Sequence, residues 1–117
     1  MAAYEIHYYA RPNGDQPTVN WLDKLDKRSR AGIMAKMQCL EEHGLQLLGT
    51  KMLKPIKGQS NLYELVGGLR GQCRVIVYYD KEDNKFVLFN GFLKKRRREA
   101  GQISEARDLL NEYCSNK

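Results

Sequence analysis

The sequence predicts an α+β domain in which two N-terminal helices pack on a small antiparallel sheet of about four strands, with a short C-terminal helix. Apolar residues recur at helical spacing in residues 19–40 and again in 103–113. Between these segments lie short runs of β-branched and aromatic residues, separated by glycine-rich or polar turns. Because helices precede a run of strands and do not alternate with them, we expect an antiparallel sheet with helices on one face.

The first half of the chain is expected to form one strand and two helices. Residues 4–9, YEIHYY, alternate bulky and polar side chains before a turn at 11–15, which is typical of a strand at the margin of a sheet. Apolar residues then recur every three or four positions, with a break near Asp26 and a stop at Gly44; the two stripes are Val19, Leu22 and Leu25, and then Ile33, Met37 and Leu40.

The second half is expected to form three consecutive antiparallel strands and a last helix. The β-rich runs are LYELV at 62–66, CRVIVYY at 73–79 and FVLFNGFL at 86–93. In the middle run, alternation puts Arg74, Ile76 and Tyr78 on one face. Between residues 103 and 113, apolar side chains then recur at helical spacing, which predicts the last helix.

The composition is that of an ordinary globular protein, which we expect to be made and kept in the cytosol. The 117 residues suit one domain over 1–117, with 42% hydrophobic and 29% charged residues. No apolar run approaches the roughly 20 residues that cross a bilayer, and residues 1–14 do not resemble a secretion signal. Three scattered cysteines and two histidines indicate neither disulfides nor a metal site, so no cofactor is expected.

The positive charge is concentrated in one part of the chain. The net charge is +6 overall, and residues 51–98 hold twelve Lys or Arg against four Asp or Glu. Five consecutive cations, KKRRR, follow the last predicted strand at 94–98. A clustered excess of this kind is the electrostatic pattern of a surface that meets nucleic acid, although a solvated basic face or a membrane-surface patch would also fit it.

Four segments in order resemble the RelE/ParE superfamily of bacterial toxins, and within it the phage-derived HigB-like branch. They are the helix pair TVNWLDKL and KMQCLEEHG, then KPIKGQSNLYEL, CRVIVYYD and FVLFNGFLKKRRREAGQISEAR. The resemblance implies a cytosolic toxin of a toxin–antitoxin module, silenced by a cognate antitoxin that often carries a helix-turn-helix domain, as in HigA-like proteins. It also implies a metal-independent endoribonuclease that cuts mRNA, commonly on the ribosome.

Cleavage of this type needs cations at the scissile phosphate. The ribose 2′-hydroxyl attacks the neighbouring phosphate, so the catalyst must help a proton leave and stabilise a more negative phosphorane. The resemblance implies that Arg74 clamps the phosphate, and that Lys94 or Lys95 acts as general acid or base. A structural ion pair between Arg74 and Glu64 is the alternative for that arginine.

Further residues are expected to hold RNA. Arg96 and Arg97 would steer phosphates, while Tyr63, Tyr78 or Tyr79 would stack on unpaired bases or, alternatively, serve in the core. If the segment is extended, a basic rim would be formed by Lys51, Lys54 and Lys57.

The chain departs from the family pattern at two places. Val66 stands where many relatives have an arginine, with Arg70 as a possible substitute, and Asn90-Gly91-Phe92 stands where some have histidine or aspartate. Two other functions therefore stay open: gyrase inhibition of the ParE kind, and RNA binding without catalysis.

Overall fold

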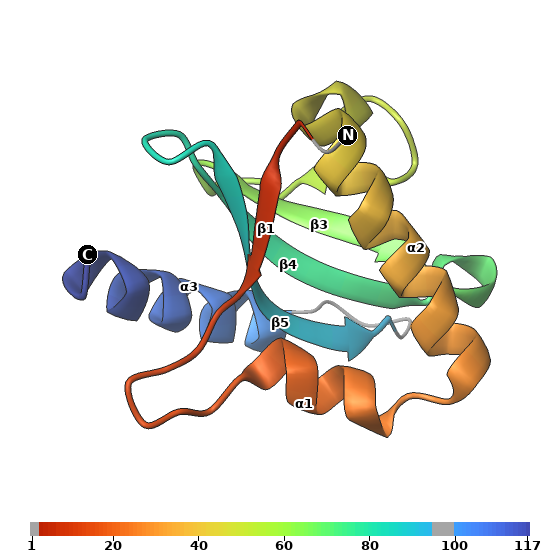
Figure 1. Cartoon of the computed structure of the whole chain (residues 1–117), viewed down its shortest axis with the longest axis horizontal. Helices are drawn as coiled ribbons and strands as arrows, with labels where there is room; N and C mark the ends of the chain where they lie inside the picture. Colours follow the sequence, from red (N-terminus) through yellow and green to blue (C-terminus); the bar gives the residue numbers. More distant parts are fainter. Residues whose placement is uncertain (1–2, 95–99) are drawn as a thin grey trace.

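The computed structural model describes residues 3–94 and 100–117, and its centre is one sheet of five strands in the order β1-β5-β4-β3-β2 (Figure 1). The strands and helices, in chain order, are β1 (Glu5–Tyr8), α1 (Pro17–Lys24), α2 (Lys27–His43), β2 (Leu53–Pro55), β3 (Leu62–Gly67), β4 (Cys73–Asp80), β5 (Lys85–Leu93) and α3 (Ala100–Ser115). Short 3-10 turns, η1 (Gly44–Leu47) and η2 (Leu69–Gly71), follow α2 and β3. The predicted α+β fold is confirmed.

Local signals explain where the first two helices begin and end. Pro17 opens α1, where its missing N–H costs nothing. The Asp26 side chain caps α2 by accepting a hydrogen bond from the Ser29 N–H at 3.1 Å. Gly44 ends α2 with φ +54°, and a Cβ there would lie 2.2 Å from the ring of Tyr4. This position needs glycine both for its backbone conformation and for the contact.

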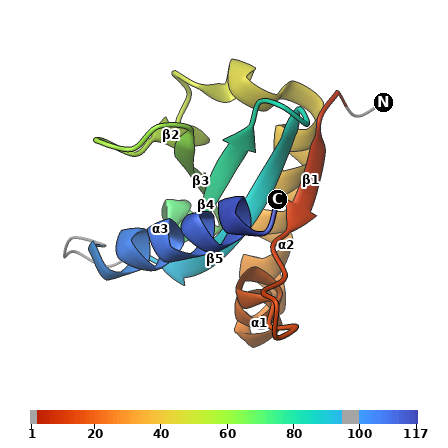
Figure 2. The same ribbon diagram turned by 90° about the vertical axis from the view of Figure 1, so that its left-hand side faces the viewer.

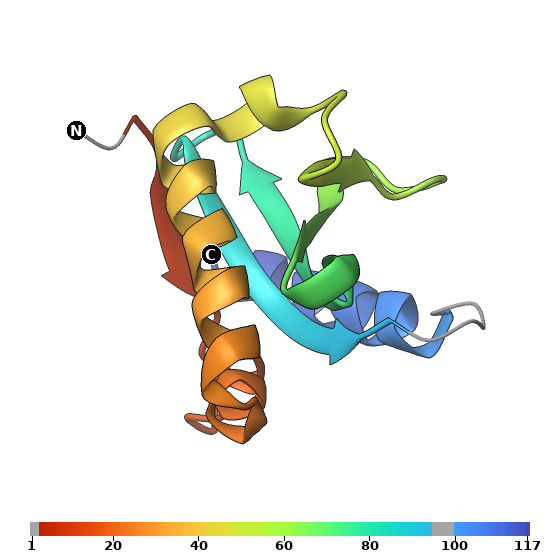
Figure 3. The same cartoon turned by 90° about the vertical axis from the view of Figure 1, so that its right-hand side faces the viewer.

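The sheet separates two hydrophobic cores (Figure 2; Figure 3). On the α2 face, the core is formed by α2 side chains and the strand residues Leu65, Val75, Val77, Phe86 and Leu88. On the α3 face it contains Ile76, Val87, Phe89, Ala106 and Leu109. The alternation predicted for β4 is confirmed, because Ile76 and Tyr78 belong to one core and Cys73, Val75 and Val77 to the other.

The sheet has one strand more than the sequence predicted, because Leu53–Pro55 forms β2 beside β3. Two further features of the arrangement were not expected. β1 does lie at a margin of the sheet, but it pairs parallel with β5, so the sheet is mixed. The helices also do not share one face, since α3 covers the side opposite α2 (Figure 2). Both features depend on which distant segments meet, and residue patterns along the chain carry no information about that.

A polar latch holds the end of α3 on the sheet. Asp80, 1% exposed at the end of β4, accepts hydrogen bonds from the Tyr113 hydroxyl at 2.6 Å and is paired with the Lys117 ammonium at 2.7 Å. Burial opposes ionisation of Asp80, but hydrogen bonds from Lys117 and Tyr113 outweigh it and hold its pKa at about 2. The latch therefore keeps a buried carboxylate ionised at neutral pH.

Within residues 3–94 and 100–117, no helix combines the length and apolar character that a membrane span requires.

Candidate functional site

A basic hollow of about 430 Å³ opens at the end of the sheet where β2, β3 and β4 meet α2. We use the name basic hollow for the space lined by the cations Lys36, Lys51, Lys54, Arg70 and Arg74, together with Met52, Val66, Gly67, Gly68 and Gly71. None of these lining residues is acidic. Four of the predicted site residues, Lys51, Lys54, Arg70 and Arg74, thus meet at one place although they come from separate segments.

Glycines allow α2 to come close to this end of the sheet. A Cβ on Gly68 would meet the Cys73 side chain, and one on Gly32 would lie 2.9 Å from the Gly68 Cα. A Cβ on Gly67 would lie 2.8 Å from Cγ of Lys36. The bare backbone at these positions lets α2 lie against η2, as Figure 1 shows, and brings Lys36 to the hollow.

Arg70 is held in an unusual backbone conformation. It lies in η2 between Gly68 and Gly71, and its own φ of +55° falls in the left-handed region that non-glycine residues rarely adopt. Its side chain is exposed and lines the basic hollow. A strained arginine on the wall of a cationic site is the kind of outlier that motivates a functional hypothesis.

Arg74 lines the basic hollow and is also part of a buried ion pair. Only 8% of the residue is exposed. Its Nε donates to the Gly71 carbonyl at 2.8 Å, and its Nη1 donates to Oε1 of Glu64 on the neighbouring strand. The ion pair considered as the alternative role of Arg74 therefore exists, and it holds the guanidinium at the wall of the hollow.

The end of β5 lies beside the start of β4. Phe92 is opposite Arg74, and the Lys94 N–H donates to the Gln72 carbonyl at 2.7 Å. Lys94 is exposed and does not line the basic hollow. The other members of the cationic block for which roles were predicted, Lys95, Arg96 and Arg97, lie outside the described residues.

The predicted stacking tyrosines lie elsewhere. Tyr63 and Tyr79 are half-buried against the α2-side core, on the face opposite Arg74. Tyr78 shares the face of Arg74, as predicted, but it stacks on Phe89 with ring centroids 6.2 Å apart beneath α3. Lys57 is exposed after β2 and does not line the hollow either. For these four residues the RNA-binding role stays a prediction.

Lys36 is the lining cation that the sequence reasoning missed. It follows Ile33 by three residues and precedes Leu40 by four, so it borders the buried stripe of α2. A lysine at such a border can rest its alkyl stem on apolar surface and send its ammonium outward. The position of Lys36 at the border of the apolar stripe could have marked it as a candidate. The sequence does not show, however, which part of the sheet lies beside this border.

Fold and basic hollow together define a small α+β protein with a cationic site suited to a polyanion. The chain belongs to the phage-derived Gp49-like protein family (DUF891), whose model matches residues 20–110. This family is of the RelE/HigB toxin type, in agreement with the predicted superfamily. A search of curated proteins finds no significant match.

Among solved structures, the chain is similar to the toxin–antitoxin complex RelBE2 from Mycobacterium tuberculosis. The sequence identity is 18%, the match covers 80% of this chain and 94% of that chain, and the TM-score is 0.49. Similarity at this level supports no conclusion about the function of this chain.

Proposed function

We propose that this protein is the toxin of a toxin–antitoxin module, of the HigB-like branch, and that it acts as an endoribonuclease on mRNA in the cytosol. The observation that carries the proposal is the basic hollow, in which five cations from α2, β2, β4 and the adjoining loops meet and in which none of the described lining residues is a carboxylate. Fixed cations at one place attract the phosphates of single-stranded RNA and stabilise charge that develops on them.

The chain's own residues could divide the work of cleavage. Arg74 offers a planar guanidinium to the phosphate oxygens, and its bonds to Glu64 and Gly71 keep that group from rotating. Lys36, Lys51, Lys54 and Arg70 would hold the flanking phosphates. The positive field would stabilise the phosphorane that forms when the 2′-hydroxyl attacks.

A proton must also leave the 2′-hydroxyl and reach the departing oxygen. Among the described residues, neither a histidine nor a carboxylate lines the basic hollow. A positioned amine can exchange a proton with the reacting oxygens. Lys94 or Lys95, which follow β5, are the residues we propose for this role.

The partners follow from the same proposal. We propose that the toxin meets mRNA on the translating ribosome, and that a cognate antitoxin with a HigA-like helix-turn-helix domain silences it. The net charge of +6 suits an acidic partner.

Primer extension on a translated messenger tests the proposal. Wild type is compared with Lys54→Ala/Arg70→Ala, because both residues are exposed and their loss leaves no buried charge unpaired. Lys24→Ala/Arg28→Ala, which likewise removes one exposed lysine and one exposed arginine but away from the hollow, is the charge-matched control. Cuts that require ribosomes, persist in the control and fall at least tenfold in the double variant support the proposal. Intact messenger with growth still arrested would contradict it and direct attention to a protein target such as gyrase.

A further inference from the structure

The two margins of the sheet differ in how they are protected against another strand. Sheet margins usually carry lysine, proline or very short strands, because their unpaired backbone groups otherwise attract further chains. β2 has all three features, with three residues that include Lys54 and Pro55. β1 consists of Glu5, Ile6, His7 and Tyr8 and has neither a lysine nor a proline. Figure 3 shows the two margins on opposite sides of the molecule.

The backbone of β1 presents free groups at its outer side. The Tyr9 N–H donates to the Leu88 carbonyl at 3.0 Å, which fixes the parallel register toward β5. Because backbone groups alternate in direction along a parallel pair, those of Ile6 and Tyr8 point away from β5. Among the described residues, no backbone hydrogen bond outside the sheet ladder involves either residue. The outer side of β1 therefore offers a row of donors and acceptors.

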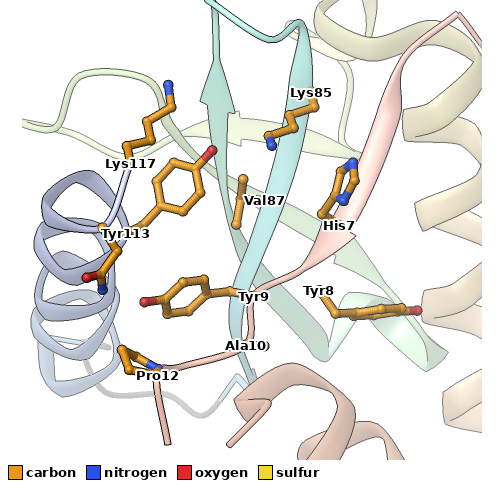
Figure 4. Close-up of a pocket in the computed structure, with 10 residues that line it drawn as sticks. His7, Tyr8, Tyr9, Ala10, Pro12, Lys85, Val87, Tyr113 and Lys117 are labelled. Atoms are coloured by element: carbon orange, nitrogen blue, oxygen red, sulfur yellow. The ribbon is translucent and has the colours of Figure 1, made fainter. Parts of the chain in front are cut away.

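Hollows lie on both sides of this margin. On the α3 side, a hollow of about 440 Å³ lies between β1 and α3, with Val87, Tyr9 and Tyr113 among its apolar walls (Figure 4). On the α2 side, a hollow of about 480 Å³ is lined by apolar side chains, including Ile6, Met34 and Met37, together with the polar Gln38 and Glu41. Since side chains alternate across a strand, a segment added to β1 would place its side chains in the two hollows in turn.

Charge distinguishes the two hollows. Of the described residues, Lys85, Lys117 and His7 line the α3-side hollow and no carboxylate does, although Nε2 of His7 lies 3.2 Å from a Glu5 carboxylate oxygen. The Lys117 ammonium is engaged by Asp80 at 2.7 Å and Glu82 at 3.1 Å, whereas the Lys85 ammonium has Asp83, at 3.6 Å, as its one acidic partner among the described residues. In Figure 4 the Lys85 side chain points toward the Tyr113 ring, 6.0 Å from its centroid. Lys85 can therefore meet an added acidic group.

We propose that the outer side of β1 accepts an extended segment of a partner protein as an additional strand. The segment would alternate apolar side chains, directed to the α2-side hollow, with acidic or aromatic ones, directed to Lys85 and Tyr113. Main-chain hydrogen bonds would supply affinity, and the hollows would supply specificity. We take the partner to be the antitoxin, and in that respect the inference rests on the proposed function.

This docking margin is separate from the basic hollow. β1 and β2 are the two ends of the strand order, and no residue lines both the basic hollow and the α3-side hollow. A segment bound to β1 would leave the basic hollow uncovered. Variants at β1 should therefore change partner binding and leave RNA cleavage unchanged.

Binding to the product of the adjacent gene, co-expressed and purified with the full chain, tests the proposal. Tyr8→Pro removes the outward N–H and spares the bonds to β5, and Tyr8→Ala removes the same side chain but keeps the N–H. We expect Tyr8→Pro to bind roughly 10-fold to 100-fold more weakly than Tyr8→Ala, because a bonding partner is left unpaired. Equal affinities of the two variants, with matching thermal melts, would overturn the proposal.

Residue-resolved amide exchange by NMR on the wild-type chain keeps the test independent of how Tyr8→Pro folds. The amides of Ile6 and Tyr8 should exchange rapidly in the free protein and become protected in the complex, while that of Tyr9 should be protected in both. Unchanged exchange at both positions in the complex would contradict the proposal. Protection that grows with concentration of the free chain would make a second copy the occupant and overturn it likewise. Absence of RNA cleavage by the wild-type chain in the primer-extension experiment would count against the proposed function and leave this measurement unaffected.

Discussion

The guanidinium of Arg74 at the start of β4 is ion-paired with the carboxylate of Glu64 on β3, at the wall of the basic hollow. Both side chains are nearly buried, with 9% and 13% of their surface exposed. The pair offsets one positive charge at the place where the other cations gather. Glu64 thus both orients Arg74 and moderates the field of the hollow.

Replacing Glu64 with glutamine should strengthen RNA binding and weaken the fold. The amide keeps the shape and a hydrogen-bond acceptor but removes the negative charge, so the hollow gains one net positive charge. We expect a loss of stability of roughly 1–2 kcal/mol, since a charge-assisted bond is replaced by a neutral one. Urea unfolding and fluorescence anisotropy with single-stranded RNA measure the two effects. Glu82→Gln, a change at an exposed residue of the β4–β5 turn, is the control. Weaker RNA binding by Glu64→Gln with an unchanged fold would contradict the idea that Glu64 moderates the positive field of the hollow.

Lys36→Gln should lower the salt dependence of RNA binding. Each phosphate contact in a single strand contributes about 0.7 to the slope of log K against log salt, so loss of one contact should reduce the slope by about that amount. Stability should change little, because the glutamine stem still covers Gly67. Lys24→Gln on α1 supplies the matched control, and equal slopes for the two variants would exclude Lys36 from the binding surface.

Arg70→Gly should stabilise the protein and weaken RNA binding. The left-handed φ of +55° costs an L-residue roughly 1 kcal/mol or more, and glycine adopts it freely. After allowing for the greater freedom of glycine in the unfolded chain, we expect a net gain of about 0.5 kcal/mol in denaturant unfolding. Arg70→Ala removes the charge but keeps the strain, so it should weaken RNA binding equally without the gain. A more stable Arg70→Ala would contradict the strain argument.

The latch at Asp80 should make stability depend on pH in the acid range. Its pKa of about 2 lies below the ordinary 3.8, so the stabilisation is present above about pH 4 and is lost as the pH falls toward 2. Asp80→Asn should cost roughly 1–3 kcal/mol at neutral pH, because the amide keeps an acceptor oxygen but removes the negative charge that pairs with Lys117. Unfolding of wild type and variant from pH 2 to 7 should show the difference between them shrinking with acidification. Asp83→Asn, a change at an exposed neighbour, should behave like wild type. If the difference in unfolding free energy between wild type and Asp80→Asn stays constant with pH, the latch is not its source.

Much of the secondary structure follows from local patterns. The strands at 62–67, 73–80 and 85–93 begin and end close to the predicted runs, and α2 ends at Gly44 as predicted. These patterns are reliable because the period of side-chain burial and the turn residues act over a few positions.

The candidate site could be predicted only in part. Lys51, Lys54, Arg70 and Arg74 were identified and meet in one hollow, but Lys36 was missed and Tyr63 lies on the other face of the sheet. A site depends on which elements meet, and spacing along the chain does not specify that.

The sequence by itself determined the α+β class, the two faces of β4 and the concentration of positive charge in residues 51–98. The tertiary structure alone decided that β1 pairs parallel with β5, that α3 covers the face opposite α2, and that α2 sends Lys36 to the basic hollow. The physical reason is range: propensity, alternation and turn chemistry act between near neighbours in the chain, whereas these contacts join segments tens of residues apart and depend on how the whole apolar surface is buried.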